Sequence, residues 1–160
     1  MTDADRLDLP ALLATLRRTP DDVAALARKV AEPALRTRRS PDEFSALENV
    51  WHLRDIEALG FLMRIRRLLS EEKPYLADVD GARLAVEGRY NERDLEAGIE
   101  SFRAARYASL AAVEAAGPGR LGVGGEMEGV GPITLRELLG RMVDHDRGHV
   151  GELEGLIGKR

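Results

Sequence analysis

The sequence predicts an all-α fold, a four-helix bundle with one long crossover connection, built as a single domain over residues 1–160. Three observations predict it. Apolar residues recur at intervals of three and four along most of the chain, as on one face of an α-helix. Two of these apolar runs begin at an S/T-x-x-E capping box. Segments that contain proline or glycine divide the pattern into four long helical stretches, as a bundle requires.

The first predicted helix covers residues 9–30, with an interruption near Pro20. Leucines recur at helical spacing before this point. Thr19 carries a good N-cap side chain, and Pro20 suits the first position of a helix, so the pattern predicts that the helix is bent or broken here and restarts at Asp21. The next segment, residues 32–44, contains two prolines and several arginines and is predicted to be a connection.

The second predicted helix begins at the capping box formed by Ser45 and Glu48, and its apolar run continues to Leu69. Pro74 prevents the helix from continuing further. Residues 74–90 include two glycines and are predicted to form the long crossover, with space for a short turn of helix.

The third predicted helix covers residues 92–116, with Asn91 as its N-cap. The positions predicted to pack inward are Ile99, Phe102, Ala105, Ala108, Ala112 and Val113. Residues 117–132 are rich in glycine and predicted to be non-helical. Their G-x-G-x-x-G pattern follows a helix rather than a strand, so a loop is expected instead of a dinucleotide site. Thr134 and Glu137 form the second capping box and open the fourth helix.

Composition excludes several function classes. The chain is 44% hydrophobic and 32% charged, which is ordinary for a soluble globular protein. A net charge of −4 argues against a nucleic-acid partner, and no apolar run is long enough to span a membrane. The N-terminus lacks a signal-peptide pattern, so a cytoplasmic location is expected. There is no cysteine, which excludes disulfides, thiolate metal ligands and a cysteine nucleophile in this sequence.

The three histidines of the chain are its most informative residues. His145 and His149 are four apart on the fourth predicted helix, so their imidazoles share one face, one turn apart. The other residues on this stripe are Leu138, Met142, Leu153 and Leu156. His52, on the second predicted helix, is expected to point inward as well. The residues that share its face are Ile56, Leu59 and Met63.

A divalent metal explains this placement best. Buried imidazoles need partners for their nitrogens, and several close together repel one another when protonated. An H-x-x-x-H pair alone is common by chance, and a lone histidine is more often a core or surface residue. All three on inward faces favour a metal held by His52, His145 and His149, because neutral imidazole binds zinc, nickel, copper or iron well. Three protein ligands leave a coordination position open, as in catalytic sites.

Further polar residues are candidates for roles around such a metal. Within one helical turn of a histidine lie Glu48, Asn49, Asp55 and Asp146. Each could orient an imidazole, although solvated helix surface is the commoner role for such residues. Arg103, Arg106 and Arg141 are candidates for contacting an anionic thiol or substrate, although arginines are abundant throughout this chain.

Two short segments carry a resemblance to a known family. Residues 45–57, SALENVWHLRDIE, form a capped helix with a histidine followed by leucine and an acidic residue. Residues 131–139, GPITLRELL, lead into residues 145–153, HDRGHVGEL. These segments, and the order of one histidine followed by an H-x-x-x-H pair, resemble the DinB/YfiT-like superfamily. Phe44 stands where that family often has tryptophan.

The resemblance implies a bundle, often dimeric, that binds zinc, nickel or iron through His52, His145 and His149. Characterised members use mycothiol, bacillithiol or glutathione, as S-transferases or as a maleylpyruvate isomerase. We therefore expect a homodimer that acts as a metal-dependent thiol transferase or isomerase, in which an activated thiolate attacks a small electrophile. Two alternatives stay open: a metal-dependent hydrolase on the same site, or a non-catalytic metal-binding or stress-response dimer.

Overall fold

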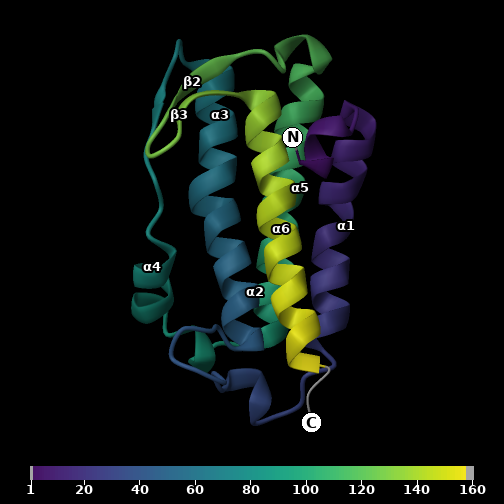
Figure 1. Ribbon diagram of the computed structural model, residues 1–160, viewed down its shortest axis with the longest axis vertical. Coiled ribbons are helices and arrows are strands. Elements are labelled where there is room, and N and C mark those ends of the chain that lie inside the picture. Colours follow the sequence, from purple (N-terminus) through teal and green to yellow (C-terminus); the bar gives the residue numbers. More distant parts are fainter. Residues whose placement is uncertain (1, 158–160) are drawn as a thin grey trace.

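The computed structural model describes residues 2–157, and four long helical rods form its body (Figure 1). Three rods are single helices. The remaining rod consists of three consecutive segments, because a π-helical stretch joins two α-helices. In chain order the rods are α1 (Leu9–Ala27), α2 with η3 and α3 (Ala46–Asp55, Ile56–Phe61 and Leu62–Ser70), α5 (Leu95–Ala116) and α6 (Leu135–Ile157).

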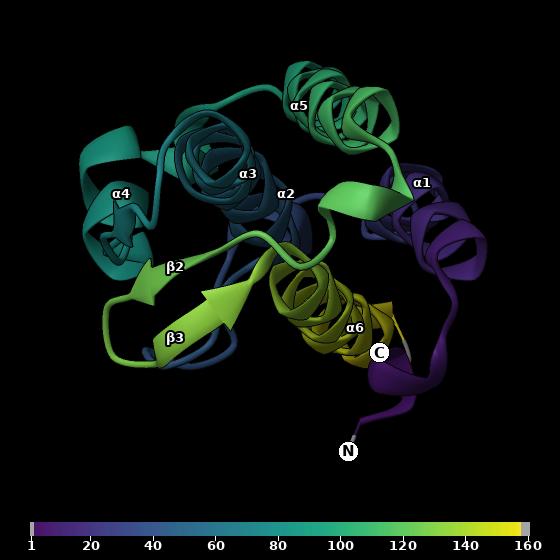
Figure 2. The same cartoon turned by 90° about the horizontal axis from the view of Figure 1, so that it is seen from above.

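The rods form a ring in which α1 and the α2–α3 rod each lie between α5 and α6 (Figure 2). The α2–α3 rod and α5 run in the same direction, so the chain between them returns along the whole bundle (Figure 1). This crossover contains β1 (Tyr75–Leu76), α4 (Gly81–Gly88) and a 3₁₀ turn, η4 (Tyr90–Glu92). The predicted all-α bundle with one long crossover is confirmed. No helix within residues 2–157 has both the length and the apolar character of a membrane span.

Both predicted capping boxes are present. The backbone N–H of Glu48 donates to Ser45 Oγ at 3.1 Å, and the N–H of Ser45 donates to Glu48 Oε1 at 3.1 Å. At α6, the N–H of Glu137 donates to Thr134 Oγ1 at 3.2 Å, and the N–H of Thr134 donates to Glu137 Oε2 at 2.8 Å. These reciprocal bonds fix where the two histidine-bearing rods begin.

The predicted restart of the first helix at Pro20 is wrong, because α1 runs unbroken through this residue. Proline has no N–H to donate to the carbonyl four residues earlier, which is that of Leu16. Arg106 Nη1 donates to this Leu16 carbonyl at 2.9 Å and supplies the missing partner. Thr19 is no N-cap; its hydroxyl bonds to Asp146 Oδ2 at 2.7 Å. A contact from another helix therefore keeps the proline inside α1.

The predicted start of the third helix is also wrong by a few residues. Asp94 is the N-cap of α5, and its side chain accepts a hydrogen bond from the N–H of Ala97 at 2.8 Å. Asn91 lies in η4, where its Oδ1 accepts from Ser45 Oγ at 2.5 Å. The predicted packing face of this helix is confirmed at its large residues, which are Ile99, Phe102 and Val113. The alanines on that face are partly buried.

A small sheet, which the sequence pattern did not predict, closes one side of the bundle. β2 (Gly124–Met127) pairs in parallel with β1 and antiparallel with β3 (Gly131–Thr134). A Cβ at Gly125 would lie 2.5 Å from the carbonyl oxygen of Pro74, so only glycine allows this approach of β2 to the crossover. The sheet and α4 both lie beside the α2–α3 rod (Figures 1 and 2).

The buried residues separate into two apolar clusters with polar side chains between them. One cluster includes Phe61, Leu110 and Met142, and the other includes Leu53, Phe102 and Leu153. On all four rods the chain thus passes from one apolar cluster to the other through a short polar stretch. The three histidines lie in this polar layer.

Candidate metal centre

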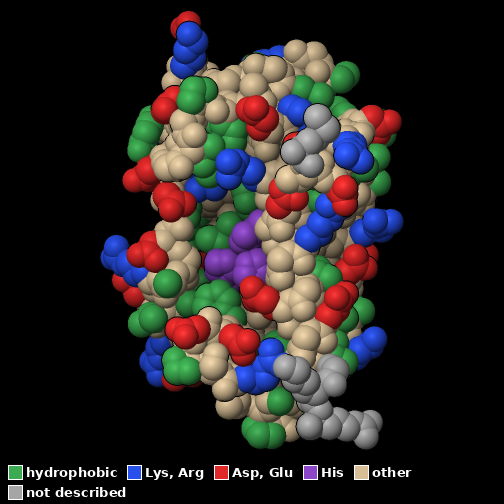
Figure 3. Space-filling model, in the orientation of Figure 1, with side chains coloured by type: hydrophobic (Ala, Val, Ile, Leu, Met, Phe, Trp, Pro, Cys, Tyr) green, Lys and Arg blue, Asp and Glu red, His purple; other side chains and the backbone are tan. Residues whose placement is uncertain are grey.

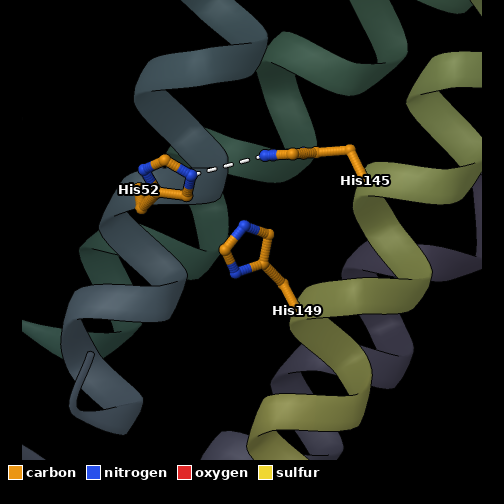
Figure 4. Close-up of side chains that lie close together, drawn as sticks. All are labelled: His52, His145 and His149. Carbon is orange, nitrogen blue, oxygen red and sulfur yellow. Dashed lines mark hydrogen bonds between the residues drawn. The ribbon is translucent and has the colours of Figure 1, made fainter. Parts of the chain in front are cut away.

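The structure brings the three predicted histidines together between α2 and α6 (Figure 4). The Nε2 atoms of His52 and His145 are 3.3 Å apart. The ring centre of His149 lies 4.6 Å from that of His52 and 4.5 Å from that of His145. One nitrogen from each ring lies within 4.8 Å of the other two. The side chains therefore point toward a common centre.

The predicted neighbours of His52 are only partly correct. Ile56 is buried, but Leu59 and Met63 are 51% and 46% exposed. The reason is the π-helical segment η3, which directly follows α2. A π-helix needs more residues per turn than an α-helix, so residues within it and beyond it no longer lie on the face that α-helical spacing predicts. His52 itself precedes η3 and keeps its inward direction.

The orientation of His149 is fixed by Asn49. The amide nitrogen of Asn49 donates to the carbonyl of Ser45 at 3.0 Å, so its Oδ1 is the atom that faces the imidazole. His149 Nδ1 lies 2.7 Å from this oxygen and therefore carries the hydrogen. Nε2 of His149 is left with a free lone pair. Glu152 Oε2, 3.2 Å from the same Nδ1, adds negative charge beside the donor.

Burial keeps the cluster uncharged near neutral pH. Desolvation lowers the pKa of His52 to about 4, and the neighbouring His149 adds to the effect. Desolvation, with the other two histidines, lowers the pKa of His145 to about 3, and desolvation lowers the pKa of His149 to about 4. At pH 7 no proton competes with a cation for these nitrogens.

The donor set fits a divalent metal. Two nitrogens that each lie about 2.1 Å from a tetrahedral zinc ion are about 3.4 Å apart. The separation between His52 and His145 is close to this value, at 3.3 Å. The ring nitrogen of His52 that faces the common centre is Nε2, whereas its buried Nδ1 faces the first turn of α4 and has no hydrogen-bond partner among the described residues. Three neutral nitrogens with a common centre are the donors that zinc, nickel and iron accept.

Two cavities adjoin the cluster from different sides. The first, here called the crossover cavity, has a volume of about 300 Å³. It is lined by His52, Ile56, Phe61, Arg64, Asp78, Val79, Gly81, Met127, Arg141 and His145. The second, here called the loop cavity, has a volume of about 520 Å³ and is lined by Arg39, Asp42, Glu43, Phe44, His149, Gly151, Glu152, Gly155 and Leu156. Figure 3 shows the histidines at the bottom of a hollow, with apolar side chains beside them.

The four polar candidates near the histidines are all buried, so the expectation of solvated surface is wrong for each. Asn49 contacts an imidazole, as described above. The other three have different partners. Glu48 pairs with Arg38 at 2.7 Å, and Asp55 accepts a hydrogen bond from the hydroxyl of Tyr90.

Asp146 belongs to a second buried cluster, here called the Arg106 network. Arg106 donates to both carboxylate oxygens of Asp146, at 2.7 and 2.8 Å, and to Glu57 Oε1 at 2.8 Å. Together with the bonds of Leu16 and Thr19 described above, these contacts join all four rods. Arg106 is thus not available to a ligand, in contrast to its predicted role. Its place between Phe102 and Leu110 on the inward stripe of α5 was the sequence signal for this network.

The other arginine candidates differ in position. Arg103 pairs with Asp21 at 2.8 Å outside both cavities. Arg141 is exposed and lines the crossover cavity. The sequence pattern missed Gly81, where a Cβ would lie 2.7 Å from Cε1 of His52, so that the first turn of α4 packs directly on this imidazole. Pattern alone carries no signal for such a contact between two segments.

Comparison with known proteins agrees with this fold. The family model of the DinB superfamily matches residues 15–153. No curated protein matches the chain. Among solved structures, YfiT from Bacillus subtilis, a probable metal-dependent hydrolase with an unusual four-helix bundle topology, superposes with a TM-score of 0.86 at 16% sequence identity. The match covers 98% of this chain and 91% of YfiT. At this identity the likeness shows the fold.

Proposed function

The chain belongs to the DinB superfamily, and we propose that it is a metal-dependent thiol transferase. His52, His145 and His149 hold a divalent ion, with zinc as the first choice and nickel or iron as alternatives. A thiol of low molecular weight, of the mycothiol or bacillithiol type, is the nucleophile. When bound, the ion would lower the pKa of this thiol, so that the thiolate is available near neutral pH.

The observation that carries the proposal is the pair of cavities that each include part of the histidine cluster in their lining. A transferase brings two substrates together, whereas a hydrolase needs one substrate and water. His52 and His145 line the crossover cavity, and His149 lines the loop cavity. The wall of the loop cavity holds three carboxylates and an arginine, which suit a thiol with hydroxyl and amine groups. The crossover cavity has more apolar lining and suits the electrophile.

The residues of the chain have separate tasks in the transfer. In this reaction a bond forms between the sulfur and an electrophilic carbon, the bond to the leaving group breaks, and the thiol proton is released. Asn49 holds the ring of His149 in one tautomer. Glu152 is the carboxylate beside His149 at the loop cavity, and burial raises the pKa of its carboxyl group, which favours it as the acceptor of the thiol proton. The homodimer stays a prediction.

A metal-dependent hydrolase is the second candidate. The neighbour YfiT is a probable metal-dependent hydrolase, and its fold covers nearly the whole of this chain. An open position beside three histidines also suits an activated water. In that case the crossover cavity alone would hold the substrate.

A metal- and thiol-dependent assay separates the two candidates. The protein, purified without a histidine tag and loaded with zinc, nickel or iron, is mixed with mycothiol, bacillithiol or glutathione and monochlorobimane, and the fluorescent thioether is followed. We expect a rate that requires both metal and thiol, that is lost in His52→Ala, and that is unchanged in Arg66→Gln, an exposed residue of α3. Thioether formation that is independent of the metal would contradict the proposal. Metal-dependent cleavage of a nitrophenyl ester without thiol, and no thioether, would favour the hydrolase.

A further inference from the structure

Arg64 on α3 is a buried cation whose positive charge has little compensation from the protein. Its residue exposure is 6%. Its Nη2 donates to the carbonyl oxygen of Ala77 at 3.1 Å, and Nε is buried without a partner in the described part of the chain. The carboxylate beside it is that of Asp78, 3.7 Å away, whose side chain is 73% exposed. Such a loose pair with an exposed carboxylate contributes little.

The other buried arginine differs in the compensation of its charge, although its Nε is also buried without a hydrogen-bond partner among the described residues. Arg106 makes hydrogen bonds to two buried carboxylates and one carbonyl group. Burial alone would lower the pKa of Arg106, but Glu57 and Asp146 outweigh it and raise this pKa. For Arg64 burial outweighs Asp78, and the pKa is lowered. A buried arginine without such partners is a receptor for an anion.

Arg64 lies one aromatic ring away from the histidines. Its guanidinium carbon is 5.7 Å from the ring centre of Phe61, and the ring of Phe61 is 5.7 Å from that of His145, edge to face. All three residues line the crossover cavity. Arg141, one helical turn before His145, lines it too, and no ion pair is found for it among residues 2–157. Asp78 is the acidic residue of this lining, so its fixed charges favour an anion.

We propose that the crossover cavity binds a substrate with a carboxylate group, which Arg64 receives and Arg141 assists. The carboxylate takes the place of Asp78 beside Arg64. The apolar part of the substrate, about the size of one ring, lies along Phe61, Val79 and Met127 and places its reactive atom at His52 and His145. This inference rests on the proposed function, because it assigns the substrate class of the same site.

The test uses metal-free protein, so that a carboxylate has no metal to bind. Benzoate combines a carboxylate with one apolar ring, and benzamide has the same shape without the charge. Binding of each is measured by NMR titration, with the ring protons of the histidines as reporters. We expect saturable benzoate binding that is at least about tenfold tighter than that of benzamide, as for a charge-assisted hydrogen bond. Equal affinities for the two probes would overturn the proposal without any variant.

Variants assign the binding to the two arginines. Arg64→Gln is expected to weaken benzoate binding by about tenfold or more, and the exposed Arg141→Gln by a smaller factor. Arg64→Lys keeps the charge and serves if Arg64→Gln does not fold. The matched controls are Arg66→Gln on α3 and Arg147→Gln on α6, both exposed, and both are expected to bind benzoate normally. A loss in these controls as large as in the Arg64 variants would overturn the assignment.

The two proposals fail separately. Metal content is measured on the same preparations. Normal metal binding with no preference for benzoate would overturn the carboxylate subsite and leave the metal-dependent function in place. Tight benzoate binding by a protein that takes up no metal would overturn the proposed function while supporting the subsite.

Discussion

The histidine cluster and the Arg106 network lie in the same polar layer of the bundle, yet their chemistry is opposite. The network is made of charged groups that are paired within the protein: Arg106 with Glu57 and Asp146, and Asp146 with Thr19. The histidine cluster is made of neutral groups that face one another, and one of its buried nitrogens has no partner among the described residues. The network also holds buried atoms without a hydrogen-bond partner among the described residues, which are Nε of Arg106 and Oε2 of Glu57. The two clusters therefore differ in charge: opposite charges face one another in the network, and neutral ring nitrogens face one another in the histidine cluster.

A structural polar cluster differs from a functional one in how its polar groups are arranged. Charged groups that compensate each other in the interior hold helices in register, and the Arg106 network joins all four rods. Neutral donors with a common centre and two adjoining cavities have a geometry that a cation would complete. Burial alone does not distinguish the two, because the residues of both lie inside the bundle. What distinguishes them is that the network pairs opposite charges, whereas the histidine cluster places neutral ring nitrogens around a common centre.

The largest expected effect of a single substitution is the loss of stability on breaking the network. Arg106→Leu leaves Glu57 and Asp146 buried without their cation and frees the Leu16 carbonyl beside Pro20. We expect the free energy of unfolding to fall by about 3–5 kcal/mol, measured by urea denaturation. The control is Arg103→Leu on the same helix, whose partner Asp21 is exposed, with an expected loss below about 1 kcal/mol. Equal losses in both variants would show that the network does not join the rods.

Acid should act on the histidine cluster before it acts on the carboxylates. The folded pKa values of about 4, 3 and 4 for His52, His145 and His149 lie below the ordinary value of 6.5. As the pH falls below 6.5, these histidines therefore bind protons in the unfolded chain but not in the folded chain, and the free energy of unfolding decreases. Between pH 7 and 5 the metal-free protein should lose about 2 kcal/mol for each histidine that stays neutral. Urea titrations at several pH values measure this, and a variant with all three histidines replaced by leucine should lose the dependence. A flat profile for the unmodified protein would contradict the burial of neutral imidazoles.

Gly81→Ala tests how the packing of α4 on His52 affects metal affinity. The new Cβ would push the imidazole of His52, which is 2.7 Å away, while the first turn of α4 tolerates alanine well. We expect metal affinity to fall by about tenfold, with the metal-free stability unchanged or raised. Gly148→Ala is the matched control: this glycine precedes His149, but a Cβ added there would meet no described atom within 4 Å. Metal titration of both variants gives the comparison, and equal affinities would remove the role assigned to the α4 contact.

The smallest expected effect concerns the orientation of His149. Asn49→Ala removes the acceptor that fixes its tautomer, but Glu152 remains 3.2 Å from the same nitrogen and substitutes in part. Metal affinity should fall by less than in Gly81→Ala, within a factor of about ten. Calorimetric metal titration checks this order. A larger loss in Asn49→Ala than in Gly81→Ala would reverse the ranking of the two supports.

Much of the fold followed from local pattern. The capping boxes at Ser45 and Thr134 and the periodicity of the four rods depend on neighbours in sequence, and they placed the histidines on facing helices. The errors arose where a contact between distant residues decides the outcome. Pro20 stays inside a helix because Arg106 donates a hydrogen bond to the carbonyl of Leu16, which the proline leaves without a backbone partner. Leu59 and Met63 are exposed because a π-helical segment changes the helical spacing. The roles of Arg64 and Gly81 depend on the crossover packing beside α3 and α2, which no local pattern encodes.

Metal content measured together with the histidine variants tests the central claim most directly. The protein is purified without a histidine tag or chelator, and metals are quantified by elemental mass spectrometry beside a His52→Ala/His149→Ala variant and Arg106→Leu. The account predicts close to one zinc, nickel or iron ion per chain, lost in the histidine variant and kept by the folded fraction of Arg106→Leu. Metal-free protein whose melting temperature does not respond to added zinc, nickel or iron would contradict it.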